Sequence, residues 1–97
     1  MVRVRRSRHV RPDMLRIWRW IGRDNPVAAD RMLHRINDAF KLIIDFPQSG
    51  ASRPELGNAV RVVPVEKYLV IYRVDEKGPL VLRVVHGAMD LTQIHIP

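Results

Sequence analysis

A run of apolar residues at helical spacing constrains this chain more than any other feature. Between residues 26 and 46, apolar side chains recur in steps of three and four, which places them on one side of a helix. These side chains are Ala29, Met32, Leu33, Ile36, Phe40 and Ile43. Asn25 is a favoured cap, Pro26 a favoured first residue, and Pro47 prevents further helix. The pattern predicts a helix over 26–46, about 31 Å long at 1.5 Å per residue. Since 97 residues is the size of one domain, residues 1–97 are predicted to form a single domain.

A shorter helix is predicted just before it. Pro12 and Asp13 suit a helix start, and the helix is expected to end near Asp24-Asn25-Pro26, because the residue before a proline resists helical geometry. Its predicted buried face consists of Leu15, Trp18, Ile21 and Gly22, with Met14 and Ile17 beside it. Arg16, Arg19 and Arg23 fall on the other face, and Trp20 lies toward the polar side. The short link between the two predicted helices indicates that they form an antiparallel helical hairpin.

The remaining segments indicate strands. Val2 and Val4 alternate with arginines and predict a first strand over 2–8, while residues 47–58 have the composition of a loop. Three strands rich in Val, Ile, Leu and Tyr are predicted over 59–65, 68–74 and 80–86. Turns at 66–67 and 75–79 make them an antiparallel meander, and Pro64 indicates an edge or a bulge. The end of the chain is expected to be a strand or an extended arm. The predicted fold is α+β, in the order β-α-α-β-β-β, with a helical hairpin packed on a small, mainly antiparallel sheet.

The turn lengths also predict a register. The first turn pairs Val65 with Tyr68 and therefore Arg61 with Tyr72, and the second pairs Val74 with Leu80 and Tyr72 with Leu82. The shared face then holds Arg61, Tyr68, Tyr72 and His86, and the opposite face holds Arg73 and Arg83. A slip of one residue would exchange the faces of the last strand.

The positive charge is concentrated at one end of the chain. The net charge is +7, and residues 1–23 account for all of it with eight arginines and one acid, Asp13. Fourteen of the 17 basic residues are arginine, whose planar fork matches carboxylate and phosphate oxygens. Three interpretations stay open here: a nucleic acid partner, an acidic protein partner, or a basic surface with no specific partner.

Several classes of function are excluded by what the sequence lacks. Without cysteine there are no disulfides, thiolate zinc sites, iron–sulfur clusters or cysteine nucleophiles, which is compatible with a reducing cytoplasm. No apolar run approaches the roughly 20 residues that span a bilayer, and no apolar segment of a signal peptide follows the basic start. The four histidines have no metal-ligand spacing, and phosphate-binding glycine motifs are missing. We therefore expect a cytoplasmic protein with no metal, no cofactor and no membrane association.

Arginine and histidine on the strands are the remaining candidates for chemistry. Arg61 and Arg83 interrupt apolar strands, and His86 ends the last one. Without a metal, arginine can stabilise a charged phosphorane while histidine or tyrosine moves a proton, so such a cluster can cleave RNA. In the alternative interpretation, each arginine is the polar position of a half-buried strand and His86 is a hydrogen-bonded structural residue.

Four stretches together resemble the RelE/ParE superfamily of bacterial toxins, and the ParE branch most. They are IWRWIGRDNPVAADRMLHRINDAFKLI, FPQSGASRPEL, VRVVPVEKYLVIYRV and LRVVHGAMDL, and the similarity runs in the same order from about residue 10 to residue 91. The resemblance implies the β-α-α-β-β-β fold and a toxin co-encoded with a small antitoxin. The antitoxins of this superfamily carry a tail, usually acidic, that is disordered when free and wraps the toxin. We therefore expect Arg16, Arg19 and Arg23 to bind the antitoxin, within a higher-order toxin–antitoxin complex.

The branch decides the expected mechanism. Ribonuclease members resemble one another in having an arginine at the position of Leu69, another at the position of Met89, and often a tyrosine near the end of the chain. Here Leu69 and Met89 are apolar, and no tyrosine follows Tyr72. The resemblance therefore implies a ParE-like inhibitor of DNA gyrase that is not itself an enzyme and has no catalytic residues. Its target-directed residues are expected to be Arg61, Arg83, His86 and Asp90, with no sequence-specific DNA binding.

Two alternatives stay open. In the first, the chain is a ribosome-dependent mRNA endoribonuclease that uses Arg61, Arg83 and His86. In the second, it is a non-toxic relic that only binds its antitoxin, because Met89 stands where the usual sequence is His-Gly-Ala-Arg-Asp.

Overall fold

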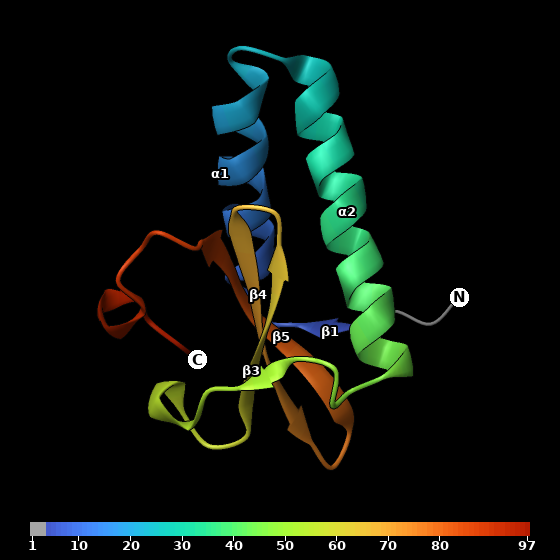
Figure 1. Cartoon of the computed structure of the whole chain (residues 1–97), viewed down its shortest axis with the longest axis vertical. Helices are drawn as coiled ribbons and strands as arrows, with labels where there is room; N and C mark the ends of the chain where they lie inside the picture. The colour runs from blue at the N-terminus through green and yellow to red at the C-terminus, as the bar shows by residue number, and fades with distance from the viewer. Residues whose placement is uncertain (1–3) are drawn as a thin grey trace.

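The computed structural model describes residues 4–97 as two helices packed on one face of a five-stranded sheet (Figure 1). Helices α1 (Val10–Gly22) and α2 (Pro26–Asp45) form the antiparallel hairpin that the sequence predicts. The strands are β1 (Arg5–Arg6), β2 (Ala51–Ser52), β3 (Val60–Val65), β4 (Tyr68–Asp75) and β5 (Gly78–His86). Their order is β1-β5-β4-β3-β2, with β1 parallel to β5 and the other pairs antiparallel. The predicted α+β class is confirmed.

Helix α2 agrees with its prediction in position and orientation. It begins at Pro26, and the Asn25 side chain caps it by accepting a hydrogen bond from the Ala28 amide at 3.0 Å. Ala29, Ile36 and Ile43 are fully buried along its inner side. None of the described helices is long and apolar enough to cross a membrane.

Helix α1 faces the core with a different side from the predicted one. It begins at Val10, before Pro12, and its buried residues are Val10, Asp13 and Ile17. Leu15 and Trp18, predicted to be buried, are 42% and 39% exposed, so that prediction is wrong. The short β1 places Val10 directly in the core, which turns the helix so that positions 10, 13, 17 and 21 point inward. The Trp18 indole instead donates a hydrogen bond to Asp30 of α2.

The register of the meander is partly confirmed. Val65 pairs with Tyr68 and Arg61 with Tyr72, as predicted. Tyr68 lies opposite His86, but a bulge after Ile71 shifts the rest of β5 by one residue. Tyr72 therefore pairs with Val81, and the predicted pairing with Leu82 is wrong.

The shift follows from the second turn, which is tighter than predicted. Asp75 pairs directly with Gly78, whose φ of 102° suits glycine, and the Asp75 carboxylate accepts a hydrogen bond from the Lys77 amide. Only two residues therefore separate the strands. The bulge restores the register toward His86 and leaves Leu82 on the face that points away from the helices.

The two outermost strands are short. The predicted first strand over 2–8 is reduced to Arg5–Arg6, and Val2 lies outside the described residues. Strand β2 falls within residues 47–58, predicted to be a loop, and pairs Ala51 with Val62. Strand β2 pairs only with residues 61 and 62 of β3. Pro64 therefore has no strand partner on that side of β3, as its missing amide predicts, although it pairs with Leu69 of β4 on the other side.

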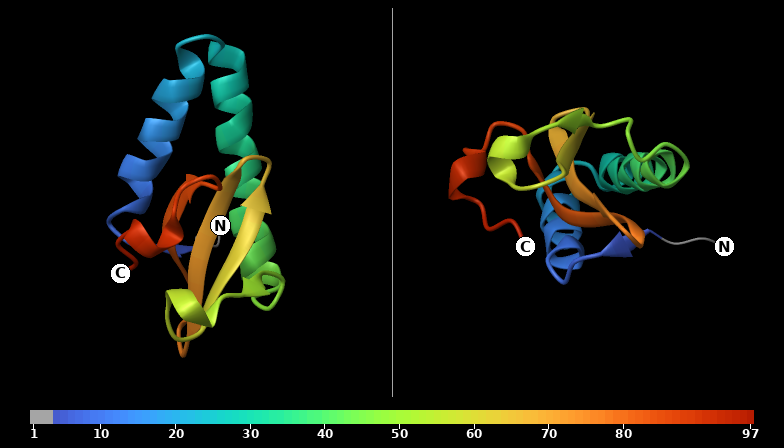
Figure 2. Two further views of the ribbon diagram at one scale, coloured as in Figure 1. Left: turned by 60° about the vertical axis from the view of Figure 1, so that its left-hand side comes forward. Right: turned by 90° about the horizontal axis from the view of Figure 1, so that it is seen from below.

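The sheet is buried on both faces. The helix-facing core includes Ile36, Phe40, Ile43, Val70 and Tyr72. The other face carries Val60, Val62, Ile71, Leu82 and Val85. Leu56 and the last residues of the chain, through Leu91, Ile94 and Ile96, pack against it. After a 3₁₀ turn at Leu91–Gln93 the chain runs back along this side, so the tail is an extended arm (Figure 2).

Candidate partner-binding surfaces

Arg83 is held by a buried carboxylate. Its guanidinium donates two hydrogen bonds to Asp13, from Nε to Oδ2 and from Nη2 to Oδ1, both at 2.8 Å. Asp13 is 1% exposed and the Arg83 side chain 15%. A third guanidinium nitrogen, Nη1, donates to the His95 carbonyl at 2.9 Å. This arginine therefore joins α1, β5 and the C-terminal arm.

Asp13 is fully satisfied by its neighbours. Besides Arg83 it accepts hydrogen bonds from Arg16 and from the Val84 amide, both at 3.0 Å. Burial acts to raise the pKa of Asp13, but the hydrogen bonds from Arg83, Val84 and Arg16 outweigh it and hold that pKa below its usual value. The same pairing raises the pKa of Arg83. Because β1 ends beside Val81, Asp13 takes the place of a strand partner for the Val84 amide.

Arg61 holds a loop rather than facing an open surface. Its Nη1 donates to the carbonyl of Gly50 at 2.7 Å and to that of Gln48 at 3.3 Å. The fully buried Tyr72 holds the same loop, since its hydroxyl donates to the Pro47 carbonyl at 2.7 Å and accepts from the Gly50 amide at 2.9 Å. A Cβ at Gly50 would lie 2.6 Å from the Tyr72 oxygen, so only glycine fits there.

His86 and Asp90 make local contacts. The His86 Nδ1 accepts a hydrogen bond from the Ala88 amide at 3.0 Å, and its ring meets that of Tyr68 edge to face at 5.3 Å. Burial raises the pKa of Tyr68. Asp90 accepts from the amide and hydroxyl of Thr92 and caps the final 3₁₀ turn, and both contacts lower its pKa.

The four residues predicted to face a target are therefore not gathered in one place. Arg61 lies opposite Tyr72 and His86 opposite Tyr68, and these two tyrosines are four residues apart on β4, about 13 Å along a strand. Arg83 and His86 do line a common groove beside α1, but Arg61 and Asp90 do not belong to it. Among residues 4–97, no three His, Asp or Glu side chains lie close enough together to hold a metal ion.

The groove between α1 and the end of β5 is mainly apolar. We call it the Trp20 groove; its walls are Ile17, Trp20, Tyr68, Val85, His86 and Met89, and it encloses about 630 Å³. Trp20 is 64% exposed and Met89 51%. Asp13, Arg16, Arg83 and Val84 complete its lining. The sequence places Trp20 toward the polar side of its helix, which agrees with its exposure.

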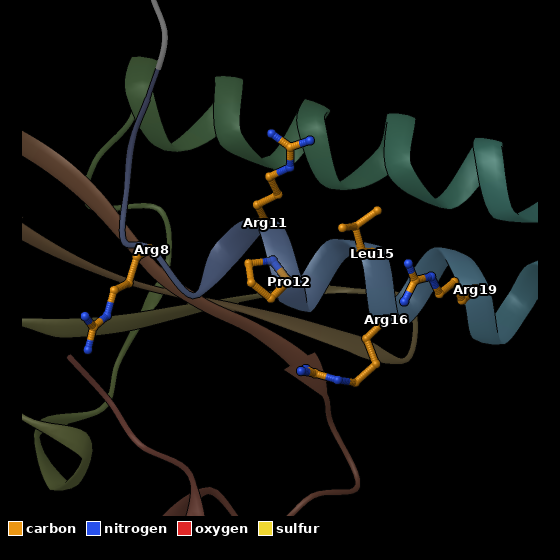
Figure 3. A pocket seen from close by; sticks show the side chains of 6 residues that line it. All are labelled: Arg8, Arg11, Pro12, Leu15, Arg16 and Arg19. Carbon is orange, nitrogen blue, oxygen red and sulfur yellow. The ribbon is translucent and has the colours of Figure 1, made fainter.

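Exposed arginines follow α1 from Arg8, just before the helix, to Arg23, just after it. We call Arg8, Arg11, Arg16, Arg19 and Arg23 the arginine ridge. Four of them surround a shallow pocket together with Pro12 and Leu15 (Figure 3). The structure places the three predicted antitoxin-binding arginines on this ridge and adds Arg8 and Arg11, which sequence reasoning counted only as part of the total charge.

The two surfaces meet at Arg16. This residue belongs to the arginine ridge and also lines the Trp20 groove, and it bonds Asp13 between them. A partner bound along the ridge therefore reaches the rim of the groove.

Comparison with known proteins places the chain among toxins. Residues 4–91 match the model of a family described as the ParE toxin of the type II toxin–antitoxin system parDE. The chain is 34% identical over 92 residues to Toxin ParE3 of Caulobacter vibrioides, covering 94% of this chain and 92% of that protein. Its fold is similar to a solved structure entitled chromosomal ParDE TA system from P. aeruginosa. The TM-score is 0.74 and the identity 22%, over 89% of this chain and 96% of the other.

Proposed function

This chain belongs to the ParE family of toxins of type II toxin–antitoxin systems, and we propose that it acts by binding, as an inhibitor of DNA gyrase neutralised by a co-encoded antitoxin. The observation that carries this proposal is that the strand arginines Arg61 and Arg83 are already bonded within the fold. A metal-free ribonuclease needs free cations beside the scissile phosphate. Here Arg83 is paired with the buried Asp13, and Arg61 is bonded to loop carbonyls about 13 Å along β4 from His86.

The Trp20 groove is the proposed target-facing surface. An exposed tryptophan and methionine beside a histidine form an apolar anchor site of the kind that dominates protein interfaces. Met89 occupies the position where ribonuclease relatives are expected to have a cation, which favours a protein partner over a phosphate at this spot. Among the predicted target-directed residues, Arg83 and His86 lie at this groove.

The arginine ridge is the proposed antitoxin-binding surface. Within residues 4–97, only Arg16 of the ridge has a carboxylate in salt-bridge range. An acidic tail that orders along the ridge would neutralise this charge and cover the groove rim at Arg16. The location is proposed to be the cytoplasm, where gyrase and the antitoxin are found.

A gyrase supercoiling assay beside an mRNA-cleavage assay in a translation extract tests the mechanism. The purified chain is expected to block supercoiling and to leave the transcript intact. Cleaved mRNA with normal supercoiling would instead establish the ribonuclease alternative. Unimpaired growth on induced expression would identify the non-toxic relic.

Two tryptophans of α1 provide matched variants for the groove. Trp20→Ala removes an indole from the Trp20 groove, and the inhibition of supercoiling is expected to weaken at least tenfold, as for an interface anchor. Trp18→Ala removes the other exposed indole of α1, which contacts Asp30 on the hairpin, and inhibition is expected to persist. Equal losses of supercoiling inhibition in both variants would show that inhibition of gyrase does not depend on this groove.

A further inference from the structure

The arginine ridge has the exposure and charge of a binding surface for a large anion. All five arginines are exposed, and within the described residues Arg8, Arg11, Arg19 and Arg23 form no salt bridge. The acid nearest in sequence, Asp13, is buried, and it already accepts four hydrogen bonds, from Arg83, the Val84 amide and Arg16, the one ridge arginine that reaches it. The positive charge of the ridge is therefore open to a partner.

The guanidinium groups do not converge on one point. In Figure 3, those of Arg8, Arg11, Arg16 and Arg19 point in different directions around the start of α1. At 100° per residue, Arg11 and Arg16 lie about 140° apart on the helix surface, and Arg19 lies between them. A single carboxylate or phosphate ion would meet one or two of these groups at a time. The arrangement suits an extended anion whose charges lie on both flanks of the helix.

The dimensions match duplex DNA. From Arg11 to Arg23 the helix advances about 18 Å, and a duplex carries about one negative charge per 1.7 Å of its axis. An α-helix is about 10–12 Å across and the major groove about 12 Å wide, so Arg16 on the flank away from α2 and Arg11 on the flank beside α2 are far enough apart to approach different phosphate backbones. Between the two flanks lie Pro12 and Leu15, which offer no hydrogen bond to a base edge, and Arg19 is the one donor between them.

From this geometry we propose that the arginine ridge binds the phosphate backbone of duplex DNA without reading its sequence. Arg11 and Arg16 contact the two strands from either flank, and Arg8, Arg19 and Arg23 extend the contact along one of them. The inference goes beyond gyrase inhibition, because DNA alone is the ligand. Duplex DNA and an acidic antitoxin tail would occupy the same surface, so they compete for it.

Fluorescence anisotropy with the full chain and a labelled duplex of about 20 base pairs tests the proposal across about 50–200 mM KCl. Binding is expected to weaken steeply with salt, and two duplexes of unrelated sequence are expected to bind within about twofold of each other. The ridge variant is Arg11→Gln, Arg19→Gln and Arg23→Gln together, since the structure gives these side chains no hydrogen bond to protein. For this variant, the slope of the logarithm of the binding constant against the logarithm of the salt concentration is expected to be shallower by about 2.7, or about 0.9 per lost phosphate contact.

The matched control removes three arginines elsewhere: Arg31→Gln, Arg35→Gln and Arg53→Gln. It has the same net charge, and two of its arginines already pair with Glu66 and Glu55. Its salt slope is expected to stay within about one of the parent slope. Equal changes in the two variants would overturn the proposal, since general charge would then explain the binding.

Two further arms identify the anion. Unlabelled duplex is expected to displace the labelled duplex better than polyglutamate or single-stranded RNA at equal charge concentration. The proposal fails if polyglutamate or RNA competes as well as the duplex, or if no binding occurs at about 50 mM KCl with about 100 µM protein. None of these outcomes depends on gyrase, so a failed supercoiling assay and a failed DNA titration are separate results.

Discussion

The two sides of α1 use arginine in opposite ways. On the inner side, Arg83 of β5 forms two bonds with Asp13, which is almost fully buried, and the pair connects the helix to the end of the sheet. On the outer side, the arginine ridge has the same residue type, exposed and largely without acidic neighbours. The difference lies in the acids: Asp13 is the only one in the first 23 residues, and it faces inward. Where the single carboxylate lies decides which arginine holds the fold and which are open to partners.

Removing that carboxylate should have the largest effect. Asp13→Ala leaves the Arg83 guanidinium and the Val84 amide buried without their acceptor, and we expect a loss of about 3–5 kcal/mol in the free energy of unfolding. Urea denaturation followed by circular dichroism measures it. Glu55→Ala, which breaks the exposed pair with Arg53, should cost less than about 1 kcal/mol. Similar values for both variants would show that the buried pair stabilises the fold no more than an exposed one.

Arg61 tests whether a second strand arginine also belongs to the fold. Arg61→Met keeps the length of the side chain but removes the donor to the carbonyls of Gly50 and Gln48, and we expect a loss of about 1–3 kcal/mol. Amide exchange in the loop at Gly50 should accelerate in the same variant. If stability is unchanged and supercoiling inhibition disappears, Arg61 faces the target as the sequence predicted.

The dependence of stability on pH sharpens the comparison further. The pKa of Asp13 is lower in the folded state than its unfolded value of about 3.9, so the unfolded chain binds more protons at acid pH. The stabilisation by Asp13 is therefore fully present above about pH 4–5 and is lost as pH falls through the folded pKa. Asp13→Asn should be less stable at neutral pH and should lose less stability on acidification. Parallel pH curves for the two proteins would contradict this role of Asp13.

The ridge should contribute least to folding. Arg19 and Arg23 are like charges four positions apart at the end of α1, and such pairs destabilise a helix by a few tenths of a kcal/mol. Arg19→Gln should therefore change the free energy of unfolding by less than about 0.5 kcal/mol, with a slight gain favoured. The melting temperature measures this, at low and at high salt. A large loss would show that the ridge serves the fold, like Arg83.

Much of the fold could be predicted because its signals are local. Helix α2 was predicted from its apolar spacing and its Asn25-Pro26 start, and the β3–β4 register from a two-residue turn. The face of α1 was predicted wrongly because Leu15 and Trp18 are as apolar as buried residues, and no local rule shows how β1 turns the helix. The bulge at Leu82 was missed because it depends on the tighter Asp75–Gly78 turn at one end and the pairing of Tyr68 with His86 at the other.

The candidate site was predictable only in part. The arginines of α1 were identified from charge and helical spacing. The contacts of Arg61 with the loop and of Arg83 with Asp13 were not predicted, because the partners are distant in sequence; Asp13 and Arg83, for example, are 70 positions apart. Asp13 itself was interpreted as a residue that suits the helix dipole, which is the local explanation for an acid in a first turn.

By itself the sequence determined helix α2 and its apolar face, the order of the two helices and the three long strands, the resemblance to a toxin family and the concentration of charge in the first 23 residues. These follow from periodicity, turn residues and counts, which do not depend on distant contacts. Only the tertiary structure decided which arginines remain free. A carboxylate can satisfy a few donors at most, and the fold brings Arg83, Arg16 and the Val84 amide to Asp13, leaving the rest of the ridge exposed.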